Sequence, residues 1–324
     1  MTERRVIFAC DFKNKTPGQH LWNLIFLFSI VLAIMMMMTD QNQIIAPTKI
    51  AYIKEITHPM EPLNVSHPRW NLDQMHDDWR KGKIQGHTIF VYSAFLDERN
   101  ASYPFIRVLS ASPQNYALDL PHIVCDIFQE DGQLLATLPI NIQFRHCCEK
   151  KPYFFLSYEC DLSRTSKSIR LAAEWVSLKS INPPDQTNTS TPNLKIHTLP
   201  RLNSKDIAGT FVVCVRPFFR NWNSTFQLIE FLEMYKILGV SHFVFYDYQI
   251  GKGAKIVLNH YEAQGLVTVL QWTLKLSTQH ILAIGQIVSI NDCKMRAINR
   301  FEFLIHVDVD EFLLPRNDLM SLMI

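Results

Sequence analysis

Residues 207–324 alternate between short apolar runs and longer segments with helical spacing. Apolar runs of this length predict strands, and the longer segments predict helices. The predicted strands are Phe211–Val215, His242–Tyr246, Val267–Trp272 and Phe303–Leu314. The predicted helices are Ser224–Leu238, Gly253–Gln264 and Ile281–Arg300. Alternation of this kind predicts an α/β domain whose parallel strand ends line a ligand crevice.

The first of these helices carries recognisable boundary signals. Ser224 and Gln227 have the spacing of a capping box, and Gly239 follows the last helical residue. Its polar residues recur every three positions and its other positions are apolar, which predicts a helix largely buried against a sheet.

The last strand, FLIHVDVDEFLL, ends in three carboxylates, Asp308, Asp310 and Glu311. A short apolar run is typical of a strand buried on both faces. Carboxylates at its end carry a desolvation penalty unless a cation or hydrogen-bond donors offset it. Mg²⁺ or Mn²⁺ prefers oxygen ligands and is often held by one or two carboxylates plus substrate phosphates. The pattern predicts a site for a metal and a diphosphate.

Two alternatives compete with a metal site here. A D-x-D after a strand is also typical of a solvated turn. Phosphatases of the haloacid dehalogenase type carry D-x-D at a strand end as well, but early in their domain and with Thr or Val two residues after the second Asp. Here that position is Phe312, and the motif comes late in the chain.

The N-terminal part predicts a membrane anchor. Residues 21–38 form an 18-residue stretch without a charge, close to the minimum for a membrane-spanning helix. Arg4, Arg5, Lys13 and Lys15 precede it, and only Lys49 and Lys54 follow within the next twenty residues. The positive-inside rule then predicts a cytoplasmic tail at 1–20, a signal anchor at 21–38 and a luminal or extracellular remainder.

Sequons and cysteines agree with that orientation. N-x-S/T occurs at Asn64, Asn100, Asn188 and Asn223, all beyond the anchor. Of the seven cysteines, six follow the anchor, where disulfides are permitted. We expect bridges among Cys125, Cys147, Cys148 and Cys160, and we interpret Cys214 as a buried thiol.

Between the anchor and the α/β part, three further segments are predicted. Residues 39–85 are polar and rich in Pro, which indicates a stem. Residues 86–181 contain short β-rich runs separated by turns, which predict a small antiparallel β domain. Residues 182–206 indicate an exposed linker. The net charge of +2, without a long basic block, gives no reason to expect a nucleic-acid partner.

Several motifs of residues 210–315 together resemble glycosyltransferase family 92. They are FVVCVRPFF (211–219), HFVFYD (242–247), GQ (285–286), NDC with a later Arg (291–296) and DVDEF (308–312). The resemblance implies a GT-A-type, Rossmann-like fold in a single-pass type II Golgi membrane protein with a luminal C-terminus. It also implies transfer of a hexose, with galactose expected, from a UDP-sugar to a glycan on a glycoprotein or glycolipid, using Mn²⁺.

The resemblance also suggests roles for individual residues. Asp310 would ligate the metal directly, and Asp308 would contact the ribose or the ion, with Glu311 in support. Asp247 would meet the nucleoside, and Arg216 and Arg296 would meet the nucleotide or its phosphates.

Each of the flanking residues has a simpler alternative. Asp247 has the pattern of an ordinary turn aspartate, and Arg216 and Arg220 that of solvated loop charges. Asp292 and Arg296 are spaced i, i+4, which also fits a surface pair.

The C-terminus departs from the family pattern. The chain ends ten residues after Leu314, whereas the family's domain continues and supplies the acceptor contacts and the carboxylate base. An inverting transfer needs a general base near the acceptor hydroxyl, and no residue here is assigned to that role. The alternative function is therefore a shortened, inactive chain that binds the donor or a partner.

Overall fold

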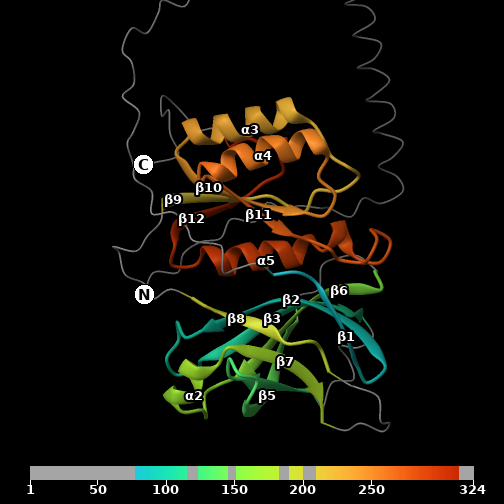
Figure 1. Ribbon diagram of the computed structural model, residues 1–324, viewed down its shortest axis with the longest axis vertical. Coiled ribbons are helices and arrows are strands. Elements are labelled where there is room, and N and C mark those ends of the chain that lie inside the picture. The colour runs from blue at the N-terminus through green and yellow to red at the C-terminus, as the bar shows by residue number, and fades with distance from the viewer. Residues whose placement is uncertain (1–76, 115–122, 145–150, 182–189, 200–208, 314–324) are drawn as a thin grey trace, which may run out of the picture. The chain divides into compact units, whose positions relative to one another are not determined.

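The computed structural model describes residues 77–114, 123–144, 151–181, 190–199 and 209–313 (Figure 1). These ranges all lie within one structural unit, Val65–Ile324. The expected tail and anchor, and the expected stem as far as residue 76, lie outside the described residues. Within the described ranges, no helix combines the length and apolar character needed to span a membrane.

The first described part is a β-barrel rather than an open sheet. Its strand order is β1-β2-β3-β6-β5-β4-β7-β8, and a pairing of β2 with β8 closes seven strands into a ring with β1 outside. All these pairings are antiparallel except β2 with β8. The strands are β1 (Arg80–Ile84), β2 (His87–Asp97), β3 (Phe105–Pro113), β4 (Ile123–Phe128), β5 (Leu134–Phe144), β6 (Tyr153–Asp161), β7 (Trp175–Ser180) and β8 (Leu194–Thr198). A short helix, α2 (Lys167–Ala172), precedes β7.

The barrel encloses its own hydrophobic core. Ile106, Tyr158 and Leu178 are fully buried there, together with both sulfurs of a disulfide between Cys125 and Cys160. The bridge joins β4 to β6. These two strands are not neighbours, because β5 lies between them in the strand order. It confirms the expectation of a bridge within this group of cysteines. Cys147 and Cys148 lie outside the described residues.

Two predicted boundaries differ from the observed ones. The range 39–85 was expected to be stem, yet β1 at Arg80–Ile84 pairs with β2 along its whole length. The range 182–206 was expected to be linker, yet β8 at Leu194–Thr198 closes the barrel against β2. Both strands are short and partly polar, so their sequences resemble the segments that flank them.

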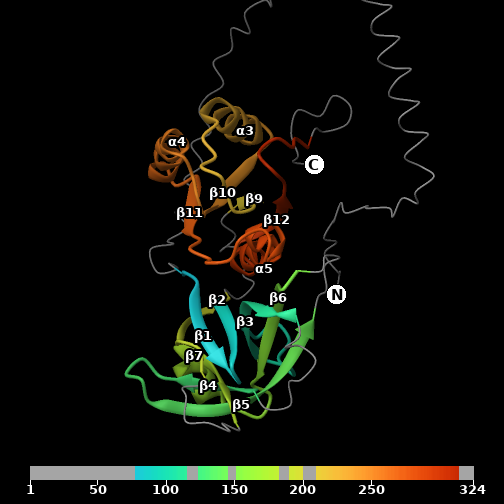
Figure 2. The ribbon, with the colours of Figure 1, turned by 90° about the vertical axis from the view of Figure 1, so that its right-hand side faces the viewer.

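The second part is a parallel α/β sheet with the order β11-β10-β9-β12. Helices α3 and α4 cover one face and α5 covers the other (Figures 1 and 2). The elements are β9 (Gly209–Cys214), α3 (Thr225–Ile237), β10 (Val240–Asp247), α4 (Lys252–Ala263), β11 (Val267–Gln271), η3 (Leu282–Ile284), α5 (Gln286–Ala297) and β12 (Phe301–His306). This confirms the predicted α/β class and its strand-helix alternation.

The last helix is shorter than predicted. Ala283, Ile284 and Gly285 all have positive φ, between 40° and 86°, so the chain cannot continue as one helix through them. α5 therefore begins at Gln286, instead of a single helix running from Ile281 to Arg300.

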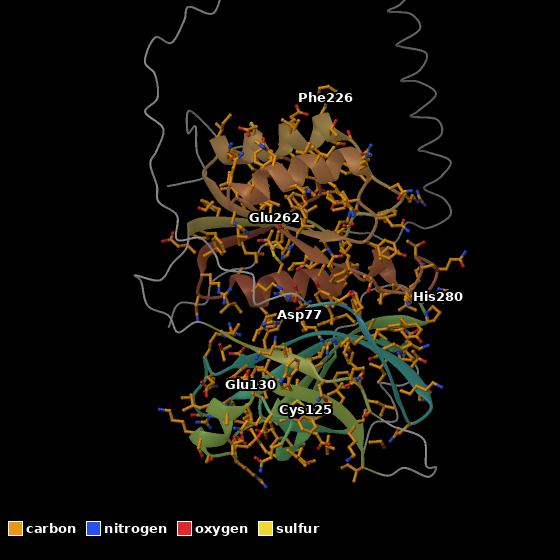
Figure 3. The ribbon with its side chains drawn as sticks, viewed as in Figure 1. Asp77, Cys125, Glu130, Phe226, Glu262 and His280 are labelled. Carbon is orange, nitrogen blue, oxygen red and sulfur yellow. A yellow bond between two sulfur atoms is a disulfide. The ribbon has the colours of Figure 1, made fainter. Side chains whose placement is uncertain are left out.

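Helix α3 differs from its prediction in two ways. Ser224 stands at its N-cap but its side chain makes no capping hydrogen bond, so the predicted capping box does not form. Its outer face carries exposed apolar side chains, Phe226 at 87% and Ile237 at 65%, so the helix is less buried than expected (Figure 3). Gly239, with φ of 93°, ends the helix region as predicted.

The barrel and the α/β part share one core. Trp79 packs edge-on against Trp272 with ring centroids 5.0 Å apart, and Tyr92 lies 4.5 Å from the same ring. α5 contributes Val288, Cys293 and other buried residues to this cluster and lies between the sheet and the barrel (Figure 2). A second cluster fills the space between the sheet and helices α3 and α4.

Candidate functional site

The centre of the candidate site lies where strands β9 and β12 end. The two strands are parallel neighbours, so the residues that follow them emerge at the same edge of the sheet. Arg216 follows β9 and Asp308 follows β12, and Nη2 of Arg216 lies 2.9 Å from Oδ2 of Asp308. The strand order also reverses at this point, since β10 and β11 extend from the other side of β9. In open parallel sheets, ligands bind at such a reversal, outside the carboxyl ends of the strands.

Asp308 is fixed by its own turn. Its backbone N–H donates to Oε2 of Glu311 at 3.0 Å, and the N–H of Glu311 donates back to its carbonyl at 3.0 Å. Burial raises the pKa of Asp308 above its ordinary value, since the opposing charge of Arg216 is offset by Glu311 and Asp310. Asp310 and Glu311 are exposed at the same turn.

The strand that leads to this turn is not buried on both faces as predicted. β12 is the edge strand of the four-stranded sheet, and Phe303 is 57% exposed. Phe303 instead stacks on Phe211 of β9, with ring centroids 5.1 Å apart. An apolar run alone does not distinguish a central strand from an edge strand.

The carboxylates of this turn have the oxygen donors that a divalent metal ion prefers. Among the described residues, no group of three or more His, Cys, Asp or Glu side chains is arranged to hold a metal ion. Asp308 and Asp310 still offer two carboxylates within one turn, which is the donor set that Mg²⁺ or Mn²⁺ uses together with phosphates and water.

Asp247, at the end of β10, has local partners. Its Oδ1 accepts the backbone N–H of Ile250 at 3.1 Å, and its Oδ2 lies 2.7 Å from Nζ of Lys255 in α4. These contacts are those of a turn aspartate. The sequence offered no signal for Lys255 as its partner, because the two meet only when α4 folds back over the sheet.

A basic and aromatic loop connects β9 to α3. Arg216 and Arg220 both lie near the ring of Phe219, with their guanidinium carbons 6.0 and 5.4 Å from its centroid. Arg220 and Asn221 have φ values of 60° and 51°, and the N–H of Arg220 donates to Oε1 of Gln249 at 3.1 Å. Consecutive non-glycine residues with positive φ are strained, and such strain is found at ligand sites.

Arg296 lies on α5 and is not exposed, although both of its sequence interpretations require exposure. Its side chain is fully buried, so it is neither half of a surface pair nor open to a phosphate. Nε donates to Oδ2 of Asp292 at 2.7 Å, and Nη2 donates to Oδ2 of Asp77 at 2.6 Å. The i, i+4 spacing with Asp292 was therefore interpreted correctly as a pair, but the pair lies on the buried face of α5.

The remaining partners of this buried network come from distant parts of the chain. Oδ2 of Asp77 also contacts Nε2 of His197 at 2.6 Å, and Asp292 accepts hydrogen bonds from the hydroxyls of Ser93 and Tyr246 at 2.7 and 2.8 Å. Burial raises the pKa of Asp77, but His197 and Arg296 outweigh it and hold that pKa below its ordinary value. Sequence analysis missed Asp77 and His197, because nothing local marks them as partners of Arg296.

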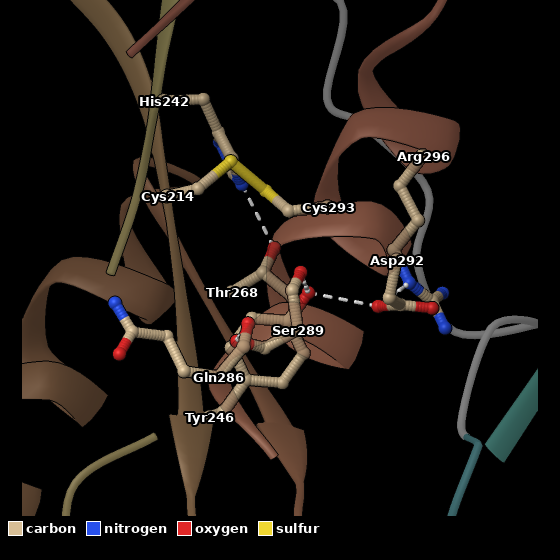
Figure 4. Close-up of a disulfide and its surroundings, with 9 residues drawn as sticks. All are labelled: Cys214, His242, Tyr246, Thr268, Gln286, Ser289, Asp292, Cys293 and Arg296. Carbon is tan, nitrogen blue, oxygen red and sulfur yellow. Dashed lines mark hydrogen bonds and ion pairs between the residues drawn. A yellow bond between two sulfur atoms is a disulfide. The ribbon is translucent and has the colours of Figure 1, made fainter. Parts of the chain in front are cut away.

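A disulfide holds the end of β9 against α5. Cys214 is bonded to Cys293, 79 residues later, and both are buried (Figure 4). The interpretation of Cys214 as a buried thiol is therefore wrong: it is buried, but bridged. Because Arg216 follows two residues after Cys214, the bridge also fixes the chain that leads into the site.

Comparison with known proteins finds similarity in the α/β part of the chain. Residues 209–323 match glycosyltransferase family 92. The chain is also similar to beta-1,4-galactosyltransferase galt-1 of Caenorhabditis elegans, with 25% identity over 105 residues. That match covers 32% of this chain and 25% of the relative, so the chain spans about a quarter of the length of the curated relative it matches.

The matched range begins at β9 and contains both strand ends that bring Arg216 and Asp308 together. The motifs that suggested the resemblance all lie inside it. The α/β part of the chain, residues 209–323, is therefore the part that matches glycosyltransferase family 92.

Proposed function

We propose that this protein transfers a hexose, and specifically galactose, from a UDP-sugar to a glycan on a glycoprotein or glycolipid. The observation that carries the proposal is the family match over 209–323, the range whose strand ends pair Arg216 with Asp308. The choice of galactose is supported by the relative that is named a galactosyltransferase.

The fold we propose for the complete catalytic domain is of the GT-A type. Its four described strands are parallel, have helices on both faces and reverse their order between β9 and β12. A UDP donor would occupy the crevice at that reversal.

In this proposal the carboxylates of Asp310 and Asp308 hold Mn²⁺. When bound, the ion supplies Lewis-acid stabilisation for the negative charge that develops on the leaving diphosphate. Arg216 provides a second positive charge beside the same turn, and guanidinium groups suit phosphate oxygens. Asp247, two strands away from Asp308 in the sheet, would meet the nucleoside.

We further propose that the protein is a single-pass type II Golgi membrane protein with a luminal C-terminus. The uncharged segment 21–38 and the positive residues before it support this orientation. The disulfides Cys125–Cys160 and Cys214–Cys293 support an oxidising compartment for the folded part.

Metal-dependent UDP binding tests the proposal. Asp310→Asn keeps the size of the side chain but removes one charge, so UDP affinity with Mn²⁺ should fall to the level measured without the ion. Glu302→Gln is the control, because Glu302 is an exposed carboxylate on β12, the strand that leads to this turn, six residues before Asp308. The measurement is calorimetric titration of the full chain with UDP, with and without Mn²⁺.

The outcomes separate the two functions that the sequence leaves open. Metal-dependent UDP binding with release of galactose from UDP-galactose onto a glycan supports a transferase. Metal-dependent binding without turnover indicates a donor-binding chain of the same family. If UDP binds equally well without Mn²⁺, or if Asp310→Asn binds normally, the metal site is wrong.

A further inference from the structure

The ion pair between Arg216 and Asp308 occupies a carboxylate that a metal would need. Both side chains remain partly open to solvent, at 38% and 26% exposure, so an ion can reach them. The other close contact of the Arg216 guanidinium that the structure shows is the ring of Phe219, 6.0 Å away. A cation–π contact at this distance in an exposed loop is weak. Little besides the ion pair itself therefore holds the guanidinium at Asp308.

We propose that Arg216 is an exchangeable counterion: a divalent cation replaces it on Asp308, and the released guanidinium pairs with a phosphate oxygen of the donor. This inference rests on the proposed function, because it assumes that Asp308 belongs to a metal and diphosphate site.

The electrostatics of the turn favour the exchange. Asp308, Asp310 and Glu311 place three carboxyl groups within four residues, and the guanidinium of Arg216 is paired with one of them, Asp308. A dication brings twice the charge of Arg216 to the same oxygens. The backbone of Asp308 is held by Glu311, so the carboxylate stays in place while its partner changes.

Exchange predicts that Arg216 has opposite effects on the two ligands. Without nucleotide, Arg216 competes with the metal, so removing it should strengthen Mn²⁺ binding. With nucleotide, Arg216 contributes a phosphate contact, so removing it should weaken UDP binding. An arginine that only contacts phosphate would leave Mn²⁺ affinity unchanged. An arginine that only holds Asp308 in position would support both ligands, so its loss would weaken the binding of both Mn²⁺ and UDP.

The test measures Mn²⁺ binding to the full chain by the loss of the electron paramagnetic resonance signal of free Mn²⁺, in the absence of nucleotide. Arg216→Gln should bind Mn²⁺ up to about fivefold more tightly than the unmodified protein, the ratio expected for removing one partly exposed ion pair. UDP affinity at saturating Mn²⁺ should fall in the same variant. For both ligands, the affinity of Arg216→Lys should lie between those of the unmodified protein and Arg216→Gln. Lysine keeps the positive charge but lacks the planar fork of the guanidinium.

Arg220→Gln is the matched control. Arg220 lies against the same Phe219 ring and carries the same charge, but its guanidinium is not the one paired with Asp308. It should leave Mn²⁺ affinity within about twofold, because a charge in an exposed loop is largely screened.

The results distinguish this inference from the proposed function. If Arg216→Gln binds Mn²⁺ no more tightly than the unmodified protein, while Asp310→Asn abolishes that binding, the exchange is wrong and the metal site stands. If both arginine variants tighten Mn²⁺ binding equally, the effect is one of net charge and the exchange is again wrong. If neither the unmodified protein nor Arg216→Gln binds Mn²⁺, the metal site fails and the exchange fails with it.

Discussion

Asp77 is the residue on which the buried network depends. One of its oxygens, Oδ2, accepts from Arg296 of α5 and contacts His197 of β8, each at 2.6 Å. All three side chains are nearly inaccessible to water. Removing one partner of such a group is costly, because the remaining charge stays buried without compensation.

Asp77→Asn should therefore lower the free energy of unfolding by about 3 kcal/mol at pH 7. The folded-state pKa of Asp77 is depressed below its unfolded value, so its contribution is complete above the unfolded pKa and is lost as pH falls through the folded pKa. The difference between variant and unmodified protein should then be constant near neutrality and shrink below about pH 4. Urea unfolding at several pH values measures it.

Glu174→Gln is the control for that prediction. Glu174 pairs with Lys195 at 2.5 Å, but both side chains are more than a third exposed. An exposed pair contributes about 0–1 kcal/mol, so this variant should remain close to the unmodified protein. An equal loss of unfolding free energy in the two variants would show that burial of the Asp77 network adds nothing to stability.

The positions of single residues were predictable only where the partner is close in sequence or where a strand end fixes the place of the residue. Asp308 was predicted from the apolar run that precedes it, and the structure places it at a sheet edge beside Arg216. Arg296 was not, because its burial depends on Asp77, which lies 219 residues earlier in the sequence. No periodicity connects two positions so far apart.

At the scale of elements, a side chain from outside α4 satisfies the start of that helix. α4 has Gly251 at its N-cap, which offers no side-chain acceptor. Oδ1 of Asn223, in the loop before α3, accepts the N–H of Ala254 at 2.9 Å instead. A Cβ atom on Gly251 would lie 2.4 Å from Cβ of Asn223, so glycine is required for this approach. The contact fastens the first turns of α3 and α4 to each other.

Asn223→Ala should destabilise the protein by about 1 kcal/mol, the usual effect of losing an N-cap acceptor. Thermal unfolding followed by circular dichroism measures the change. Asn100→Ala is the matched control, since it also removes a sequon and an Oδ1 acceptor, that of Ser102 N–H, but in an exposed turn. A shift as large for Asn100→Ala as for Asn223→Ala would argue against a capping role.

Elements were predictable where length and boundary residues agree. The strands β9, β10 and β11 and the helices α3 and α4 lie within a few residues of their predicted ranges, and Gly239 and Gly265 adopt the positive φ expected at helix ends. β1 and β8 were missed because each is only five residues long and lies among polar residues. Their strand structure comes from pairing with β2 rather than from local preference.

At the scale of the whole molecule, the α/β part depends on the barrel. The family match starts at residue 209, but the core beneath α5 includes Trp79, Tyr92 and Phe95 from the barrel. Hydrogen bonds also cross this boundary: the hydroxyl of Tyr92 donates to the carbonyl of Gln271 at 3.0 Å, and that of Thr273 donates to Asp78 at 2.6 Å. The two parts were predicted as separate domains from their different periodicities. Their shared core could not be predicted, because both barrel and sheet bury residues with the same apolar patterns.

A chain that begins at residue 209 should therefore not fold cooperatively. It would expose the apolar face of α5 to water and leave Arg296 without Asp77. A chain of residues 77–324 keeps both parts and should unfold in one transition, seen alike by tryptophan fluorescence, near Trp272, and by far-ultraviolet circular dichroism. The shorter chain should show a broad transition and bind a hydrophobic dye at neutral pH. If residues 209–324 instead unfold in one sharp transition within a few degrees of the longer chain, the barrel is an independent domain, and the shared core stabilises neither part.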